Sequence, residues 1–214
     1  MKYNTVIFDM DGTLLNTLED LHDSLNAMLR KNGYSEKSLD EVRRFIGNGV
    51  GVLIKLALPK ACTEEDFNRC AADFKETYKK NMQNKTRPFD GIRELLLELK
   101  QNNYKVAIVS NKFDPAVKAL TKDYFGNLIP VAIGESAAVK RKPAPDCVLM
   151  AVKELGSDIR HTIYVGDSET DVRTAQNAGI PCVGVTWGYR GRKVLIEAGA
   201  DYLIDTPGEL MSIL

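Results

Sequence analysis

The spacing of apolar residues changes along the chain and divides it into two kinds of segment. Residues 6–8 form an unbroken apolar run of β-branched and aromatic side chains, which predicts a buried strand. From Leu18 onward, apolar residues recur at spacings of three and four, and this period predicts helices. The helices predicted in this part of the chain are 18–29, 39–45, 50–58 and 63–82. We find no strand-like run between about residues 16 and 84, so we expect an all-helical insert.

Short apolar strands alternate with helices from about residue 88 to the end of the chain. The predicted strands are 106–109, 131–133, 162–165, 182–185 and 202–204, and the predicted helices are 92–102, a helix from 115, 146–155, 170–178 and 193–198. Strands that are apolar throughout and separated by helices are typical of a parallel sheet covered on both faces. We therefore predict an α/β fold, a Rossmann-like three-layer core whose central parallel sheet has the opening strand as a central member.

Local signals support several of the predicted helix ends. Thr63 followed by Asp66 is typical of a capped helix start, and Gly33 and Gly179 are placed to end helices. Asp114 before Pro115 predicts an N-cap residue followed by proline at the first helical position.

The composition excludes several classes of function. The 214 residues include 29 Lys plus Arg and 29 Asp plus Glu, so no net charge attracts the chain to nucleic acid or to an anionic membrane. Four scattered cysteines without a Cys-x-x-Cys pair predict free thiols rather than a zinc or redox motif. No apolar stretch has the length of a membrane span and no signal peptide precedes the first strand, so we predict a cytoplasmic protein.

The first strand ends in two carboxylates, Asp9 and Asp11, followed by Gly12. Side chains two residues apart on extended backbone lie on one face, so these two carboxylates can converge on one point. Like charges in one place repel each other unless a cation lies between them, and Mg²⁺ is the natural candidate. An ordinary turn is the alternative, whereas a calcium loop is excluded because Thr13 and the residues after it do not continue its pattern.

Polar residues also follow two other predicted strands. Residues 110–112, Ser-Asn-Lys, follow one strand, and the acidic segment 166–171 follows another. A basic cluster, 140–142, lies between them and precedes prolines. Each group alone has a structural explanation as a turn, a solvated charge or a helix cap. Ligands bind at the carboxyl ends of parallel strands, so together these groups predict metal-assisted phosphoryl transfer.

These segments match, in order, the four motifs of the haloacid dehalogenase superfamily of phosphotransferases. The matching residues are 9–14, 110–111, 142–143 and 166–171. The helical insert resembles the small α-helical cap of that superfamily, which implies a catalytic core of residues 1–15 and 85–214 and a cap of residues 16–84. Within the superfamily, segments 20–21, 45–49, 111–112 and 142–145 are most similar to phosphoglycolate phosphatases.

The resemblance implies a role for each charged residue of the motifs. Asp9 would be the nucleophile that forms an aspartyl-phosphate, and Asp11 the general acid and base. Asp167 would complete a Mg²⁺ site with Asp9 and the backbone carbonyl of Asp11. Asp171 would orient metal-bound waters or Lys142 without binding the metal directly. Lys142 would neutralise charge on the nucleophile and the phosphate.

The resemblance also implies the substrate contacts. Thr13, Ser110 and Asn111 would bind the substrate, the last two through its phosphoryl oxygens. The glycine-rich segment 47–51 is either a turn between two helices or a loop that closes over the core. In the second case Gly47, Asn48 and Gly49 would contact the leaving group, with Arg43 or Arg44 as nearby cations.

Two departures from the family pattern are Asn16, where relatives often have an acid, and the additional acid Glu169.

The function that the resemblance implies is a Mg²⁺-dependent phosphatase for a small phosphorylated metabolite, with phosphoglycolate as the best candidate. The alternatives are a β-phosphoglucomutase-like isomerase, a pyrophosphatase and a phosphate-binding module without catalysis. We expect no nucleic-acid or membrane partner and a monomer or weak homodimer.

Overall fold

The computed structural model describes residues 2–214 and contains one six-stranded parallel sheet. The strands are β1 Thr5–Phe8, β4 Lys105–Phe113, β5 Val131–Glu135, β6 Thr162–Gly166, β7 Cys182–Val185 and β8 Tyr202–Ile204. Their order is β5-β4-β1-β6-β7-β8, with Val6 opposite Val106 on one side and Ile163 on the other. The predicted parallel sheet with a central opening strand is therefore confirmed.

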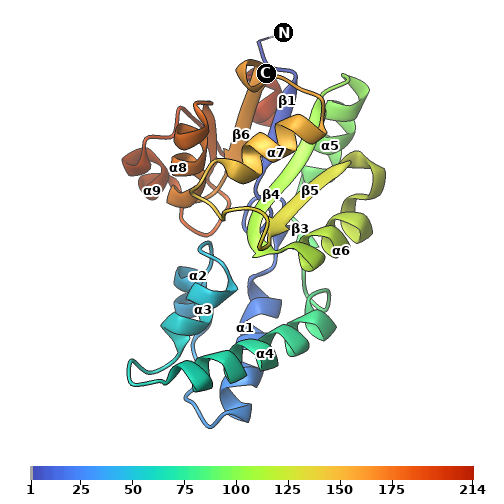
Figure 1. The fold of residues 1–214 in the computed structure, drawn as a ribbon. Helices are drawn as coiled ribbons and strands as arrows, with labels where there is room; N and C mark the ends of the chain where they lie inside the picture. Colours follow the sequence, from blue (N-terminus) through green and yellow to red (C-terminus); the bar gives the residue numbers. More distant parts are fainter. Residues whose placement is uncertain (1) are drawn as a thin grey trace.

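Helices cover both faces of the sheet, which gives three layers (Figure 1). Val6 and Phe8 face a cluster that includes residues of α5 Ile92–Gln101 and α6 Asp114–Phe125. Ile7 points to the opposite face, which packs on α7 Asp146–Glu154, α8 Glu169–Ala178 and α9 Arg192–Ala198. The short helices are η1 Gly126–Leu128, η2 Ile159–His161 and η3 Pro207–Ser212. Because successive residues of a strand point to opposite faces, one short run of β1 supplies both cores.

The helical insert lies beyond the carboxyl ends of β1 and β4 (Figure 1). Its helices are α1 Leu18–Lys31, α2 Leu39–Phe45, α3 Val50–Ala57 and α4 Glu64–Asn81. They pack around an apolar cluster of their own, in which Leu25, Ile54 and Phe74 are completely buried. Four helices between β1 and the rest of the sheet agree with the predicted insert, while the domain boundaries at 15/16 and 84/85 stay a prediction.

Two very short strands, β2 Leu15–Asn16 and β3 Arg87–Pro88, join the insert to the sheet. They pair antiparallel, with Leu15 opposite Pro88. Asp20 of α1 reinforces this junction, because its buried carboxylate accepts backbone N–H bonds from Lys85 and Thr86 at 2.8–3.0 Å. The sequence did not predict these strands, since two residues are too few to show a periodic pattern.

The predicted elements are present, with ends that shift by a few residues, and two local predictions differ more. Thr63 and Asp66 form the expected capping box. Asp114, however, is the first helical residue rather than the N-cap, and its carboxylate accepts the N–H of Gly134 at 3.0 Å. The strand predicted at 106–109 continues to Phe113, with a register irregularity after Val109.

Among residues 2–214, no helix is long and apolar enough to cross a membrane.

Candidate active site

The turn after β1 brings Asp9 and Asp11 to the carboxyl edge of the sheet. The N–H of Asp9 still donates to Val165 of β6 at 2.9 Å, so the strand pairing fixes the position of this residue. Gly12 follows with φ +89°, and a Cβ atom at this position would lie 2.5 Å from Asp167 Oδ2. Only glycine combines that backbone conformation with such a close approach, and the turn therefore brings Asp167 next to the β1 exit.

Lys142 is the central cation of this edge and is buried, not a solvated surface charge. Its Nζ lies 2.7 Å from Asp9 Oδ1 and 2.7 Å from Asp171 Oδ1, and donates to Tyr164 Oη at 3.0 Å. Asn111 fixes the backbone of Lys142, because its side chain accepts the Lys142 N–H at 2.8 Å and donates to the Lys142 carbonyl at 3.1 Å. The predicted motif residues 111 and 142 are thus brought together.

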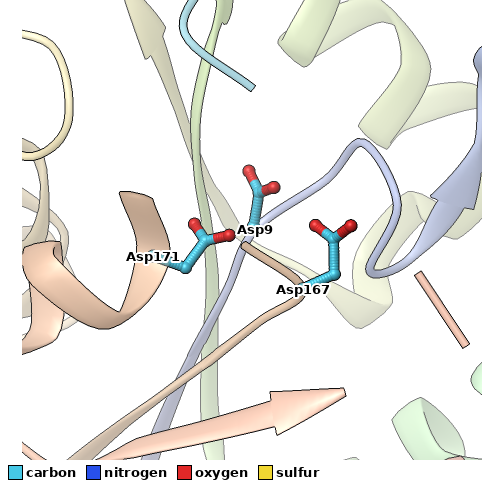
Figure 2. A group of neighbouring side chains, drawn as sticks. All are labelled: Asp9, Asp167 and Asp171. Carbon is cyan, nitrogen blue, oxygen red and sulfur yellow. The ribbon is translucent and has the colours of Figure 1, made fainter. Parts of the chain in front are cut away.

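Asp9, Asp167 and Asp171 converge from β1, the β6 exit and α8 (Figure 2). One oxygen of each lies within 4.8 Å of the others. Asp171 is fully committed to protein donors: Oδ1 accepts from Lys142 and Tyr164, and Oδ2 accepts from the N–H and hydroxyl of Ser168. This geometry favours the expectation that Asp171 orients Lys142.

The other two carboxylates have oxygens available for a metal. Asp9 accepts a hydrogen bond only at Oδ1 and Asp167 only at Oδ2, counting donors within residues 2–214. Burial raises the pKa of Asp9 to about 7, although Lys142 opposes the shift. Burial, together with the charges of Asp171 and Asp9, also raises the pKa of Asp167 well above its usual range. Two buried carboxylates that repel each other are a donor set that suits a hard divalent cation.

Asp11 lies apart from this cluster and is held by its own cation. Lys112 Nζ donates to both Asp11 oxygens, at 2.9 and 3.0 Å, and the Thr17 hydroxyl donates to Oδ1 at 2.6 Å. Burial alone would lower the pKa of Lys112, but the attraction to the Asp11 carboxylate outweighs this effect, and the pKa of Lys112 is raised. The ring of Tyr78 in α4 packs against the Lys112 ammonium group, with Lys112 Nζ 4.8 Å from the ring centre. This contact connects the insert to the Asp11–Lys112 pair.

A small cavity of about 30 Å³ lies between the insert and the strand exits. Its lining residues are Asp9, Asp11, Leu21, Ile46, Gly47, Gly49, Val50, Leu53, Ser110, Asn111 and Lys112. Six residues predicted to act in the site are among them. Position 49 needs glycine for two reasons: φ is +84°, and a Cβ atom there would lie 3.2 Å from the Asn111 carbonyl oxygen.

Other predicted residues lie away from the cavity. Thr13 is completely buried, and its hydroxyl has no hydrogen-bond partner within residues 2–214. The Asn48 side chain accepts a hydrogen bond from Thr170 of α8 at 3.1 Å. Arg43 pairs with the exposed Asp40 at 2.9 Å, and Arg44 donates to the Asp40 carbonyl. The substrate roles of these residues stay predictions.

The segment after β7 contributes contacts that no sequence pattern predicted. Trp187 Nε1 donates to the Thr13 carbonyl at 3.0 Å, and the Tyr189 N–H donates to Asp167 Oδ2 at 2.6 Å. Arg190 reaches the insert. A signal for this segment was present, since Trp-Gly-Tyr-Arg follows a predicted strand of the parallel sheet, at the same edge as the other exits.

Comparisons with known proteins agree with this geometry. Residues 6–185 match the sequence model of the haloacid dehalogenase-like hydrolases. A phosphoglycolate phosphatase of Rhodobacter capsulatus is 34% identical over 86% of this chain and 85% of its own length. A phosphoglycolate phosphatase of Haemophilus influenzae is 31% identical and covers 100% of this chain and 99% of its own.

A solved structure gives the same result for the fold. The crystal structure of a predicted phosphoglycolate phosphatase from Haemophilus somnus superposes with a TM-score of 0.92, at 29% identity, and covers 100% of this chain and 98% of that one. The family match spans most of the chain, and the motif residues lie together at one edge of the sheet. The protein described here therefore belongs to the haloacid dehalogenase-like hydrolase family.

Proposed function

We propose that this protein is a Mg²⁺-dependent phosphatase that hydrolyses a small phosphate monoester through an aspartyl-phosphate on Asp9. Phosphoglycolate is the substrate we favour. The observation that carries the proposal is the grouping of Asp9, Lys142 and Asp167 at the edge of the sheet, with Lys142 Nζ 2.7 Å from Asp9. A site that only bound phosphate would not need a carboxylate nucleophile held beside a cation.

The residues present fit a magnesium ion. Asp9 and Asp167 would hold it with the backbone carbonyl of Asp11, because both carboxylates retain an oxygen without a protein donor within residues 2–214. Asp171 would not be a direct ligand, since both its oxygens accept hydrogen bonds from the protein. When bound, the ion supplies positive charge that offsets the repulsion between the nucleophile and the phosphate.

In the first step, a carboxylate oxygen of Asp9 attacks phosphorus and the bond from phosphorus to the leaving oxygen breaks. Asp11 gives its proton to that oxygen, which departs as an alcohol. Lys142 offsets negative charge at Asp9 and the phosphoryl group, and Ser110, which lines the cavity, binds a phosphoryl oxygen. Both side-chain N–H groups of Asn111 donate to the carbonyls of Gly47 and Lys142, so Asn111 shapes the cavity wall and does not bind the phosphoryl group through its amide. Lys112 and Thr17 hold the Asp11 carboxyl group in place for this proton transfer.

In the second step, water attacks the phosphorus of the aspartyl-phosphate. Asp11 takes a proton from that water, the bond between phosphorus and the Asp9 oxygen breaks, and inorganic phosphate leaves. Each cycle therefore returns Asp9 as a carboxylate and Asp11 as an acid, and consumes one ester and one water.

The substrate proposal rests on the size of the site and on the named relatives. Three apolar side chains of the insert, Ile46, Val50 and Leu53, wall the cavity beside Asp9 and Asp11, and this close wall favours a leaving group of few atoms. Two relatives from Haemophilus influenzae that match this chain over nearly their full length are named phosphoglycolate phosphatases. Localisation in the cytoplasm and a monomeric or weakly dimeric state remain predictions.

The test is phosphate release from phosphoglycolate, sugar phosphates, nucleotides and pyrophosphate, each with Mg²⁺ and with a chelator. We expect the highest kcat/KM for phosphoglycolate and no turnover without the metal. Asp9→Asn should abolish turnover, and unchanged phosphate release by this variant would exclude the covalent mechanism. Conversion of a sugar phosphate to its isomer without phosphate release would instead identify a mutase, and preference for pyrophosphate a pyrophosphatase.

A further inference from the structure

Arg190 connects the strand-exit edge of the sheet to the helical insert. Its guanidinium group donates to the carbonyl of Arg43 at 2.8 Å, to that of Arg44 at 3.4 Å and to that of Ile46 at 2.5 Å. These carbonyls lie at the C-terminal end of α2, where the last turn of a helix leaves carbonyls without partners inside the helix. A cation at this end is also favoured by the helix dipole.

Glu169 holds Arg190 from the core side. Its Oε2 lies 3.3 Å from Arg190 Nε, and the arginine side chain is only 13% exposed. Glu169 is the additional acid in the fourth motif, and its position beside Arg190 accounts for it. Because Nε pairs with Glu169, the terminal nitrogens of the guanidinium are left to face the insert.

The segment that Arg190 holds is the wall of the candidate site. Ile46, whose carbonyl Arg190 binds, and the next residue, Gly47, both line the cavity. Two further contacts from the core hold the same segment: Asn111 Nδ2 donates to the Gly47 carbonyl at 3.1 Å, and Thr170 donates to Asn48 at 3.1 Å. Of the three side chains, only Arg190 is charged, so its bonds are the strongest of the group.

We propose that Arg190 is a positioning residue that holds segment 46–49 of the insert closed over the site, with Glu169 orienting its guanidinium group. Substrate bound beneath this wall would be retained more tightly while the Arg190 contacts are made. The proposal rests on the proposed phosphatase function for its kinetic test, but its structural test needs no activity.

If closure and chemistry are separate, loss of Arg190 lowers the fraction of molecules in the closed form. The apparent affinity for substrate then falls in proportion to the fraction of closed molecules. Saturating substrate still shifts the population to the closed form. We therefore expect Arg190→Ala to raise KM for the ester that the wild type hydrolyses by about 10- to 100-fold, with kcat changed less than about threefold. Arg190→Lys should fall between, because one ammonium group cannot reach three carbonyls.

The matched control is Arg192→Ala. Arg192 lies two residues further along and pairs with Asp205 at 2.6 Å, but its side chain is 50% exposed and makes no hydrogen bond or ion pair with the insert within residues 2–214. This variant should leave KM unchanged. Millimolar methylguanidinium, which can occupy the space left by the side chain, should restore KM in Arg190→Ala, and methylammonium should not.

Amide hydrogen exchange tests the closure without any substrate. In Arg190→Ala, amides of residues 42–50 should exchange faster, while those of α5 and β6 exchange as in the wild type. Equal exchange of residues 42–50 in both proteins, or faster exchange throughout the chain, would overturn the proposal. So would a loss confined to kcat. If the wild type hydrolyses no ester, the proposed function fails, and the exchange result still decides the role of Arg190.

Discussion

Replacement of Lys142 by methionine tests whether this buried cation balances the acidic cluster. The side chain is 2% exposed and lies 2.7 Å from oxygens of both Asp9 and Asp171. Methionine has a similar length and no charge, so the variant loses little packing but leaves buried carboxylates without their cation. At an effective dielectric constant of about 20, each contact at this distance corresponds to about 6 kcal/mol of attraction, which the cost of burying the lysine partly cancels.

The free energy of unfolding of the metal-free protein should fall by about 3–5 kcal/mol at pH 8, because removal of the lysine leaves buried carboxylates without their cation. Protons can replace the lost cation, because Asp9 already has a pKa raised to about 7 by burial. At pH 5 the loss should therefore be smaller, about 1–2 kcal/mol.

Urea unfolding at both pH values, with a chelator present, measures these losses. The control is Lys118→Met, which breaks an exposed ion pair with Asp114 and should cost about 0–1 kcal/mol at either pH. An equal loss for Lys142→Met at pH 5 and pH 8 would refute the reasoning, because it would mean that the lysine contributes packing rather than charge.

Three further outcomes follow from the site and its junction. Since the pKa of Asp9 is about 7 in the folded protein against 3.8 unfolded, the folded state binds the proton more tightly, and the metal-free protein should lose stability as pH rises from about 4 to 7. Mg²⁺ should therefore raise Tm more at pH 8 than at pH 5, and an equal rise would contradict the assignment of the site. Gly12→Ala should weaken Mg²⁺ binding at least about tenfold in a titration, because its Cβ would lie 2.5 Å from Asp167 Oδ2. The control is Gly156→Ala, whose Cβ would meet nothing within 4 Å. It should lower the free energy of unfolding by only about 1 kcal/mol, the cost of its backbone conformation. Asp20→Ala should cost about 1–3 kcal/mol in urea unfolding, because it leaves the N–H of the buried residue Thr86 and that of Lys85 without an acceptor. Asp20→Asn should cost less, and equal costs would show that the acceptor oxygens do not matter.

The layers of the fold were predictable because periodic patterns encode burial directly. Val6 to Phe8 is apolar at every position, and such a strand must be covered on both faces wherever it lies in the chain. The grouping of Asp9, Ser110 and Asp167 followed from a further rule, that parallel strands present their carboxyl ends at one edge.

Contacts between distant segments were not predictable in the same way. The family resemblance placed Lys142, a motif residue, near Asp9, but no local pattern indicates that Lys112 pairs with Asp11. Arg190 illustrates the same limit, because its partners are backbone carbonyls, which every sequence carries. Such contacts depend on how segments far apart in the sequence pack against one another, and a local pattern does not carry that information.

The pairing of β2 with β3 has a consequence for how such a protein can change over time. Leu15 and Pro88 lie opposite each other, so the chain leaves the sheet and returns to it at a single place. In topological terms the entire insert is the loop of a β-hairpin. The entropy of closing a loop grows only with the logarithm of its length. An insert of a different size or shape can therefore be exchanged at this junction while the sheet and its catalytic edge keep their register, so substrate choice can diverge without rebuilding the chemistry.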